Sequence, residues 1–123
     1  MSITSFEDLI VWQRAMTLVQ EIYGVTQTFP ADERFGLTAQ LRRAAVSIPS
    51  NIAEGHERQT TRDYIRFVSI AEGSLAEVRT QLRIGCDLGY CSIDAMSSTF
   101  NEMKEIKRML NALRRSLHER QPG

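Results

Sequence analysis

The polar side chains best placed to act together lie along one ridge of the segment 37–56. Arg43, Ser47, Asn51, Glu54 and Arg58 follow each other at steps of four, four, three and four residues. Residues three or four apart share one face of a helix, so this spacing sets the five side chains in one row. A row of two arginines, a carboxylate, a hydroxyl and an amide could bind a ligand or bond to a second helix.

A second polar group interrupts the apolar pattern of the segment 61–88. Ser74 and Glu77 stand among its apolar positions, and a carboxylate flanked in this way is expected to be partly buried. A buried charge needs a partner, so we expect an ion pair with Arg42 or Arg43 and a bond from Asn51 across the helices.

We interpret these residues as an interhelical polar network that fixes helix register. A ligand or substrate site built on the same groups, or a subunit interface, remains an alternative. The network comprises Arg42, Arg43, Ser47, Asn51, Glu54, Ser74 and Glu77.

Other reactive residues form no recognisable catalytic or metal-binding pattern. His56 and His118 have no cysteine or carboxylate at ligand spacing, and neither belongs to the Glu-x-x-His pairs of bundle di-metal sites. Cys86 and Cys91 are five residues apart rather than in a Cys-x-x-Cys motif, and we expect ordinary thiols. Phosphate-loop and dinucleotide motifs are also missing from the sequence. The sequence therefore predicts no catalytic residue, no cofactor, no metal and no enzymatic activity.

The segment 93–117 carries a basic face. Its basic residues are Lys104, Lys107, Arg108, Arg114 and Arg115. Such a row can follow the phosphates of a nucleic acid, because Lys and Arg contacts supply the sequence-independent part of binding. Glutamates are interspersed with these bases, which is equally typical of a solvated helix face.

The elements that must position these residues are helices. Apolar residues recur every three or four positions through most of the chain, and strand alternation is absent. Short connections make sequential helices antiparallel, so the sequence predicts an all-α, up-down-up-down four-helix bundle forming a single domain over 1–123. Pro49 does not shift the apolar phase and is expected to kink its helix. The predicted helices span about 6–28, 37–56, 61–88 and 93–117.

Composition excludes several classes of protein and indicates where in the cell this bundle is expected. The 123 residues hold 15 Lys plus Arg and 15 Asp plus Glu, and the formal net charge of zero excludes a uniformly basic nucleic-acid coat. Apolar runs fall far short of the roughly 20 residues of a membrane-spanning helix. The N-terminus lacks the basic start of a secretory signal, and two cysteines make no disulfide framework. We expect a cytoplasmic protein with no membrane partner.

The first helix has more apolar surface than one bundle core should use. Its apolar residues form two ridges, whose centres are roughly 110° apart around the helix. The first ridge consists of Leu9, Trp12, Met16, Val19 and Tyr23. We expect the second ridge to face a neighbouring subunit and so to form an oligomer interface. This second ridge consists of Val11, Ala15, Leu18, Ile22 and Val25.

Several motifs are shared with a known family. The stretches DLIVWQRA at 8–15, RRAAVSIPSNIAEG at 42–55 and AEGS at 71–74 resemble the bacterial 23S rRNA intervening-sequence family, from about residue 6 to residue 117. The resemblance implies a four-helix bundle without known enzymatic activity that forms ring-like homo-oligomers, typically pentamers. The chain is also similar to the accessory proteins of diversity-generating retroelements, which are basic rings that work with a reverse transcriptase and RNA. The neutral charge of this chain departs from theirs.

The leading hypothesis is therefore a non-enzymatic, cytoplasmic homo-oligomeric bundle that serves as an assembly or scaffold protein. Its principal partner would be further copies of itself. The alternative is an RNA- or DNA-associated accessory protein that binds phosphates through the basic face at 93–117.

Overall fold

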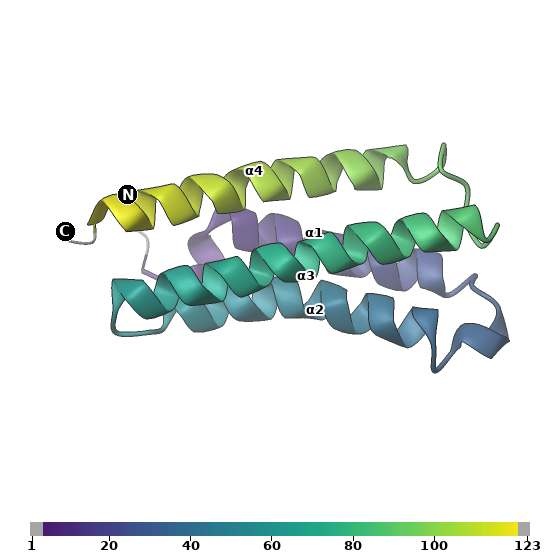
Figure 1. Ribbon diagram of the computed structural model, residues 1–123, viewed down its shortest axis with the longest axis horizontal. Coiled ribbons are helices and arrows are strands. Elements are labelled where there is room, and N and C mark those ends of the chain that lie inside the picture. The colour runs from purple at the N-terminus through teal and green to yellow at the C-terminus, as the bar shows by residue number, and fades with distance from the viewer. Residues whose placement is uncertain (1–3, 121–123) are drawn as a thin grey trace.

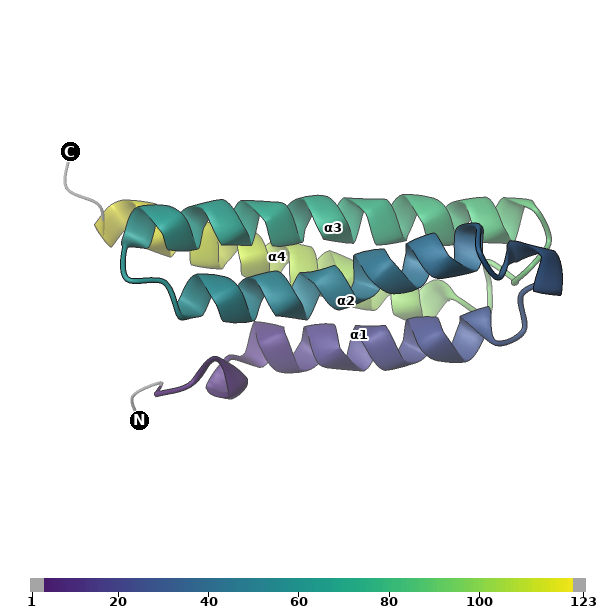
Figure 2. The ribbon, with the colours of Figure 1, turned by 90° about the horizontal axis from the view of Figure 1, so that it is seen from below.

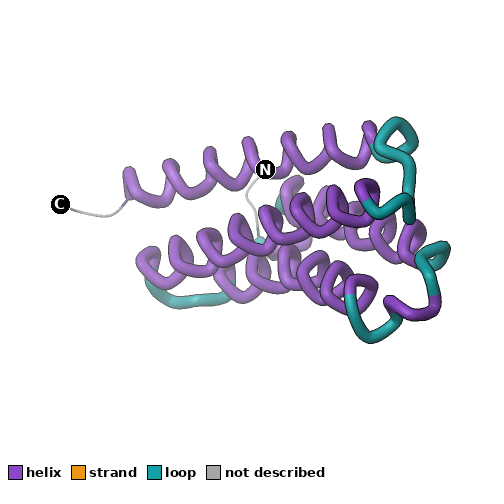
Figure 3. The backbone as a smooth tube through the Cα atoms, turned by 45° about the vertical axis from the view of Figure 1, so that its right-hand side comes forward, coloured by secondary structure: helices purple, strands orange, loops and turns teal. Residues whose placement is uncertain are grey.

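A computed structural model describes residues 4–120 and shows four long helices with no strand in that range (Figures 1 and 3). The four-helix fold class predicted from the sequence is confirmed. The elements in chain order are the 3-10 turn η1 (Phe6–Asp8), α1 (Ile10–Thr26), the 3-10 turn η2 (Ala31–Glu33), α2 (Leu37–His56), α3 (Thr61–Asp87) and α4 (Ser97–Arg120).

The four helices lie side by side along one axis, and sequential helices run in opposite directions (Figure 2). Contacts between α1 and α4 follow this arrangement. Arg14 of α1 bonds to Glu102 of α4, whereas Glu21, two turns later on α1, accepts a bond from Thr99, which is earlier on α4. Each helix therefore turns one side toward a shared interior.

That interior is almost wholly aliphatic. Each helix contributes residues that recur at three- and four-residue steps, as the sequence pattern predicts. Twelve large side chains have less than 2% of their surface exposed, and they come from all four helices. They are Leu18, Ile22, Leu41, Ile48, Ile52, Val68, Val78, Leu82, Met103, Ile106, Leu110 and Leu117.

The first helix begins later than predicted. Ser5 and Asp8 do form a reciprocal cap, but the cap opens the short turn η1 instead of a long helix. Leu9 then adopts an extended conformation with ψ of 126°, which breaks the helical hydrogen-bond pattern before α1 starts at Ile10.

The helix α2 continues through Pro49, which is buried against the rest of the bundle. The prediction of one continuous element is therefore correct. Proline cannot donate a backbone hydrogen bond to the carbonyl four residues earlier, and the kink expected from this loss stays a prediction.

The connection from α3 to α4 differs from the prediction. Gly89, with φ of +83°, lets the chain turn back after α3, and the amide of Tyr90 donates to the carbonyl of Gly85. Turns then occupy the following residues, so α4 begins at Ser97, and it extends to Arg120. Ile93, the first residue of the predicted helix 93–117, precedes α4 and is 46% exposed.

Candidate interaction surfaces

The structure corrects the predicted oligomer interface. Ala15, Leu18 and Ile22 have no exposed surface and Val11 is nearly buried, while Val25 is half-buried at the end of the ridge. Val11, Ala15, Leu18 and Ile22 form the core of the chain itself and cannot also contact a second subunit, so the predicted interface is wrong for these four residues. The core takes this ridge because it is compact and aliphatic, whereas the other ridge carries a tryptophan and a tyrosine, whose polar tips tolerate water.

The other ridge of α1 is the one left partly in water. Met16 and Tyr23 are about two-fifths exposed, at 38% and 40%. Val46 of α2 is 41% exposed. It lies on the same side as Tyr23, because Arg42, one turn before Val46, packs over the Tyr23 ring at 4.5 Å. We call this surface the α1–α2 strip. It comprises Trp12, Met16, Val19, Tyr23 and Val46.

The polar row of α2 contributes one link to α3. The hydroxyl groups of Ser47 and Ser74 lie 2.8 Å apart, and Ser74 is buried. The amide Nδ2 of Asn51 donates to the carbonyl and to the hydroxyl of Ser47, at 2.8 and 2.9 Å. The bond predicted from Asn51 across the helices is wrong, because its amide bonds within α2 and Ser47 makes the interhelical contact.

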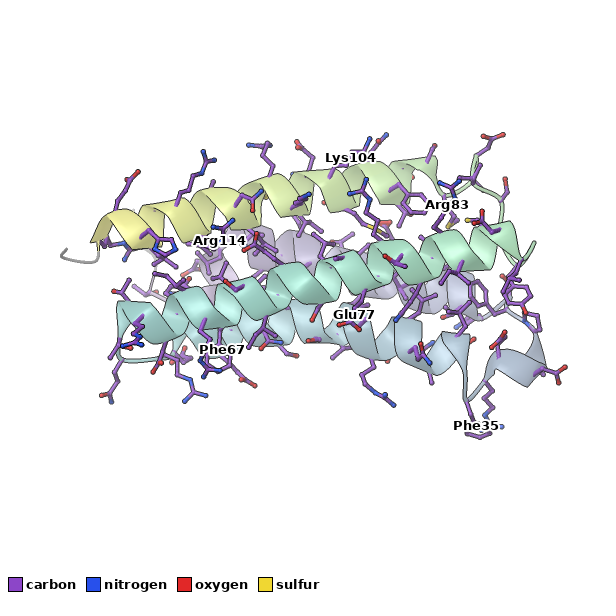
Figure 4. All side chains as sticks on the ribbon, in the orientation of Figure 1. Phe35, Phe67, Glu77, Arg83, Lys104 and Arg114 are labelled. Carbon is purple, nitrogen blue, oxygen red and sulfur yellow. The ribbon has the colours of Figure 1, made fainter. Side chains whose placement is uncertain are left out.

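The charged members of the predicted network do not join it. Glu77, Arg43 and Glu54 are exposed, and none of them forms an ion pair with another residue between 4 and 120. Figure 4 shows Glu77 on the side of α3 that faces α2, yet it lies about 60° around the helix from Ser74 and therefore farther from the core. The predicted ion pair of Glu77 with Arg42 or Arg43 is wrong.

Arg42 instead connects α2 to α1. Its Nε donates to the hydroxyl of Thr26 at 2.9 Å, and a terminal nitrogen donates to the carbonyl of Tyr23 at 3.4 Å. The guanidinium also covers the tyrosine ring, where the ring quadrupole attracts a cation. Arg42 therefore bonds to α1, on the side of α2 opposite to Ser74.

The basic face of α4 is divided between structural pairs and unpaired cations. Arg114 donates to Glu72 of α3 at 2.7 Å, and this carboxylate holds the pKa of Arg114 above its ordinary value. Arg108 is paired with Glu105 on its own helix at 3.0 Å. The remaining predicted residues, Lys104, Lys107 and Arg115, are exposed and have no ion pair within residues 4–120.

A groove of about 880 Å³ lies between α3 and α4, and sequence reasoning missed it. Its large apolar lining residues are Leu75, Ile84, Ile93, Phe100 and Met103. Its basic lining residues are Arg79, Arg83, Lys104 and Lys107. In Figure 4, Arg83 and Arg114 both lie in the space between the two helices. The sequence places Arg79 and Arg83 outside the core ridge of α3. That they share a surface with the lysines of α4 is visible only once the two helices are packed together. We call this feature the α3–α4 groove.

The two cysteines meet at the end of α3. The Sγ atoms of Cys86 and Cys91 are 3.1 Å apart, a contact that the sequence spacing does not predict. Burial, and then the contact with Cys86, raises the pKa of Cys91 to about 12. Cys91 is therefore a protonated thiol at neutral pH.

Two histidines and one exposed phenylalanine lie outside these surfaces. His56 packs edge-on against the ring of Tyr64, and His118 is exposed on α4. Phe35 is 87% exposed in the connection before α2, beside Arg34, and projects away from the bundle in Figure 4. Within residues 4–120 no cluster of three or more His, Cys, Asp or Glu side chains is arranged to hold a metal ion. None of the helices in that range has the length and hydropathy that crossing a membrane requires.

Together, the fold and these surfaces define an all-helical bundle with an aliphatic core, a partly exposed apolar strip and a basic groove. Residues 7–112 match the family of 23S rRNA-intervening sequence proteins, and the chain belongs to that family. Comparison with curated proteins gives no match.

A solved structure shares the fold. It is a protein of unknown function from the S23 ribosomal protein family of Bacteroides thetaiotaomicron. The two superpose with a TM-score of 0.78 at 22% sequence identity, covering 85% of this chain and 97% of that one.

Proposed function

We propose that this chain is a non-enzymatic protein that assembles with copies of itself and acts as a scaffold. The α1–α2 strip is the observation that carries the proposal. Met16, Tyr23 and Val46 each leave about two-fifths of their surface in water along two adjacent helices. Burial of such a strip against another subunit is favourable, at roughly 25 cal/mol per Å² of apolar surface before the entropy of association is subtracted.

The engagement of the polar side chains supports a non-enzymatic role. The hydroxyl groups of Ser47 and Ser74 contact each other, and the amide of Asn51 is bonded to Ser47. The ion pair between Arg114 and Glu72 likewise links two helices. These groups hold helices together, and the proposal assigns them that structural role. The free thiols fit the cytoplasm, where disulfides are rare.

The proposed number of five subunits comes from the family resemblance, because the strip alone does not fix the number. A pentameric ring requires that the strip meet a different surface of the neighbouring subunit, because a self-matching contact would close as a dimer. The proposal therefore includes a heterologous contact between subunits.

The test compares charge substitutions inside the α1–α2 strip with a charge substitution on the other flank of α1. Met16→Glu combined with Val46→Glu places carboxylates in the strip and should dissociate the assembly while the helix content is retained. Ile10→Glu is the matched control, since Ile10 is 60% exposed and lies on the other flank of α1. Sedimentation velocity gives the mass, and circular dichroism gives the helix content. A double variant with the mass of the unmodified protein would refute the strip as the interface.

The alternative function, binding of RNA or DNA through α4, has less support. Two of its five predicted basic residues, Arg108 and Arg114, are paired with glutamates, so their charges are partly neutralised. Lys104, Lys107 and Arg115 remain for phosphate contacts. If they bind phosphates, affinity for a nucleic acid should fall steeply between low and physiological salt.

A further inference from the structure

The α3–α4 groove presents a surface that the scaffold role does not use. Its lining includes Ile84 and Ile93, which are 42% and 46% exposed, and the half-buried ring of Phe100. Apolar side chains exposed to water gain free energy when an apolar partner covers them. The exposed isoleucines therefore favour a partner with apolar side chains.

The rim of the groove has an excess of positive charge. Arg83 is paired with Asp87, and the lining residue Glu72 is held by Arg114. Arg79, Lys104 and Lys107 are exposed without an ion pair inside residues 4–120, and the remaining acid in the lining is Asp94. Three unpaired cations thus face one carboxylate, and the groove favours an acidic partner.

We propose that the α3–α4 groove binds an acidic amphipathic helix of a partner protein. On α3 the lining runs from Glu72 to Ile84, which at 1.5 Å per residue is about 18 Å of helix. A partner helix of three to four turns fits this length, with its apolar face on the apolar lining residues and its acidic flanks against the lysines and Arg79.

The lining argues against two other occupants. The exposed isoleucines offer bases no aromatic surface, and the lining of the groove has a single, half-buried aromatic ring for stacking against bases. The α1–α2 strip of a second copy is apolar, but its residues include no carboxylate and Arg42 lies beside it. It therefore lacks the negative charge that the rim would complement.

The experiment measures binding of labelled synthetic helices to the full-length protein by fluorescence anisotropy. The probe is a peptide of about 15 residues with leucines at i, i+3, i+4 and i+7 and glutamates on both flanks. One control peptide replaces the glutamates by lysines, and another replaces the leucines by serines. A single-stranded RNA and a duplex RNA of similar length are the nucleic-acid probes.

The acidic amphipathic peptide should bind, and both control peptides should bind at least about tenfold more weakly. Lys104→Glu should weaken its binding by a similar factor, and Ile84→Gln with Ile93→Gln should also weaken it. Arg43→Glu is the matched control for charge, because Arg43 is exposed on α2, forms no ion pair within residues 4–120, and its replacement changes the net charge equally. This variant should bind like the unmodified protein.

Several results would overturn the proposal. These are failure of the acidic peptide to bind, equal effects of Lys104→Glu and Arg43→Glu, or tighter binding of RNA that is lost in Lys104→Glu. Dissociation of the homo-oligomer by Lys104→Glu would make the groove a subunit contact and would also reject a partner helix. Because the scaffold proposal depends on the α1–α2 strip, each of the two can fail without the other.

Discussion

Ser47 occupies the point where α2 and α3 are joined by hydrogen bonds. Its hydroxyl contacts Ser74 and accepts a bond from Asn51, and loss of this oxygen would leave the buried Ser74 hydroxyl without that partner. Ser47→Ala should therefore lower the free energy of unfolding by about 1–2 kcal/mol. Denaturant titration followed by circular dichroism measures this change.

Glu77→Ala is the comparison for Ser47→Ala. Because Glu77 is exposed and forms no ion pair in residues 4–120, its loss should change the free energy of unfolding by less than about 0.5 kcal/mol. A larger cost at Glu77 than at Ser47 would restore the charged network that the sequence suggests.

Cys91 should resist ionisation in the folded state. Its pKa is raised from 9.0 to about 12, chiefly by burial, so near pH 10 this residue should contribute about one thiolate fewer in the folded chain than in the chain in denaturant. The unfolded thiol releases its proton above about pH 9, whereas the folded one retains it. The thiol therefore makes the free energy of unfolding fall as the pH rises from 9 to 12.

Ultraviolet absorbance of the thiolate measures the first effect, and denaturant titration at several pH values measures the second. Cys91→Ser should remove the contribution of this thiol to the pH dependence. Equal thiolate absorbance in the folded and unfolded chains near pH 10 would mean that Cys91 is not buried.

At the scale of the helices, Gly55 allows α2 and α3 to approach closely. A Cβ atom at Gly55 would lie 2.9 Å from both the Cβ of Phe67 and the ring of Tyr64, closer than side chains pack. Gly55→Ala should therefore cost about 1–3 kcal/mol in the free energy of unfolding, despite the higher helix propensity of alanine.

Gly73 provides the matched control inside α3. No atom lies within 4 Å of a Cβ built at this position, so Gly73→Ala should stabilise the protein by about 0.5–1 kcal/mol through helix propensity alone. If both substitutions stabilise the protein, the contact between α2 and α3 is looser than described.

The elements were largely predictable because three- and four-residue periodicity reports directly on helices. The bounds of α2 match the prediction, and α3 ends one residue earlier than predicted. The start of α4 could not be predicted, since Ile93 and Met96 continue the apolar pattern even though turns separate them from the helix. Periodicity also did not show which ridge of α1 enters the core, because both ridges are apolar.

The candidate sites were predictable only in part, because they depend on how the helices are rotated against each other. Ser47 and Ser74 meet as neighbours, but Glu77, three residues beyond Ser74, is already in solvent. The α3–α4 groove combines residues from two helices that are each unremarkable alone. The approach of Cys86 to Cys91 depends on the turn at Gly89, which sequence spacing does not reveal.

At the scale of the whole molecule, the balance of charge is uneven in space although it is zero in sum. Three cations that form no ion pair inside residues 4–120 line the α3–α4 groove, while the α1–α2 strip is apolar. The two surfaces lie on different pairs of helices, so an oligomer built on the strip leaves room for a different partner at the groove.

The buried ridge of α1 also changes the expected effect of mutations there. Leu18→Glu or Ile22→Glu would place a carboxylate in a core position with no exposed surface. Such a buried charge without a partner should unfold the chain instead of separating folded subunits. Substitutions in the strip are therefore the ones that test assembly.

The mass of the unmodified full-length protein in solution tests the central claim most directly. Sedimentation velocity over a range of micromolar concentrations should show an assembly larger than one chain of 14.0 kDa. Five chains of 14.0 kDa would give about 70 kDa, the mass expected if the family resemblance extends to the subunit number. A single species of 14.0 kDa across the whole range would contradict self-assembly and the scaffold role with it.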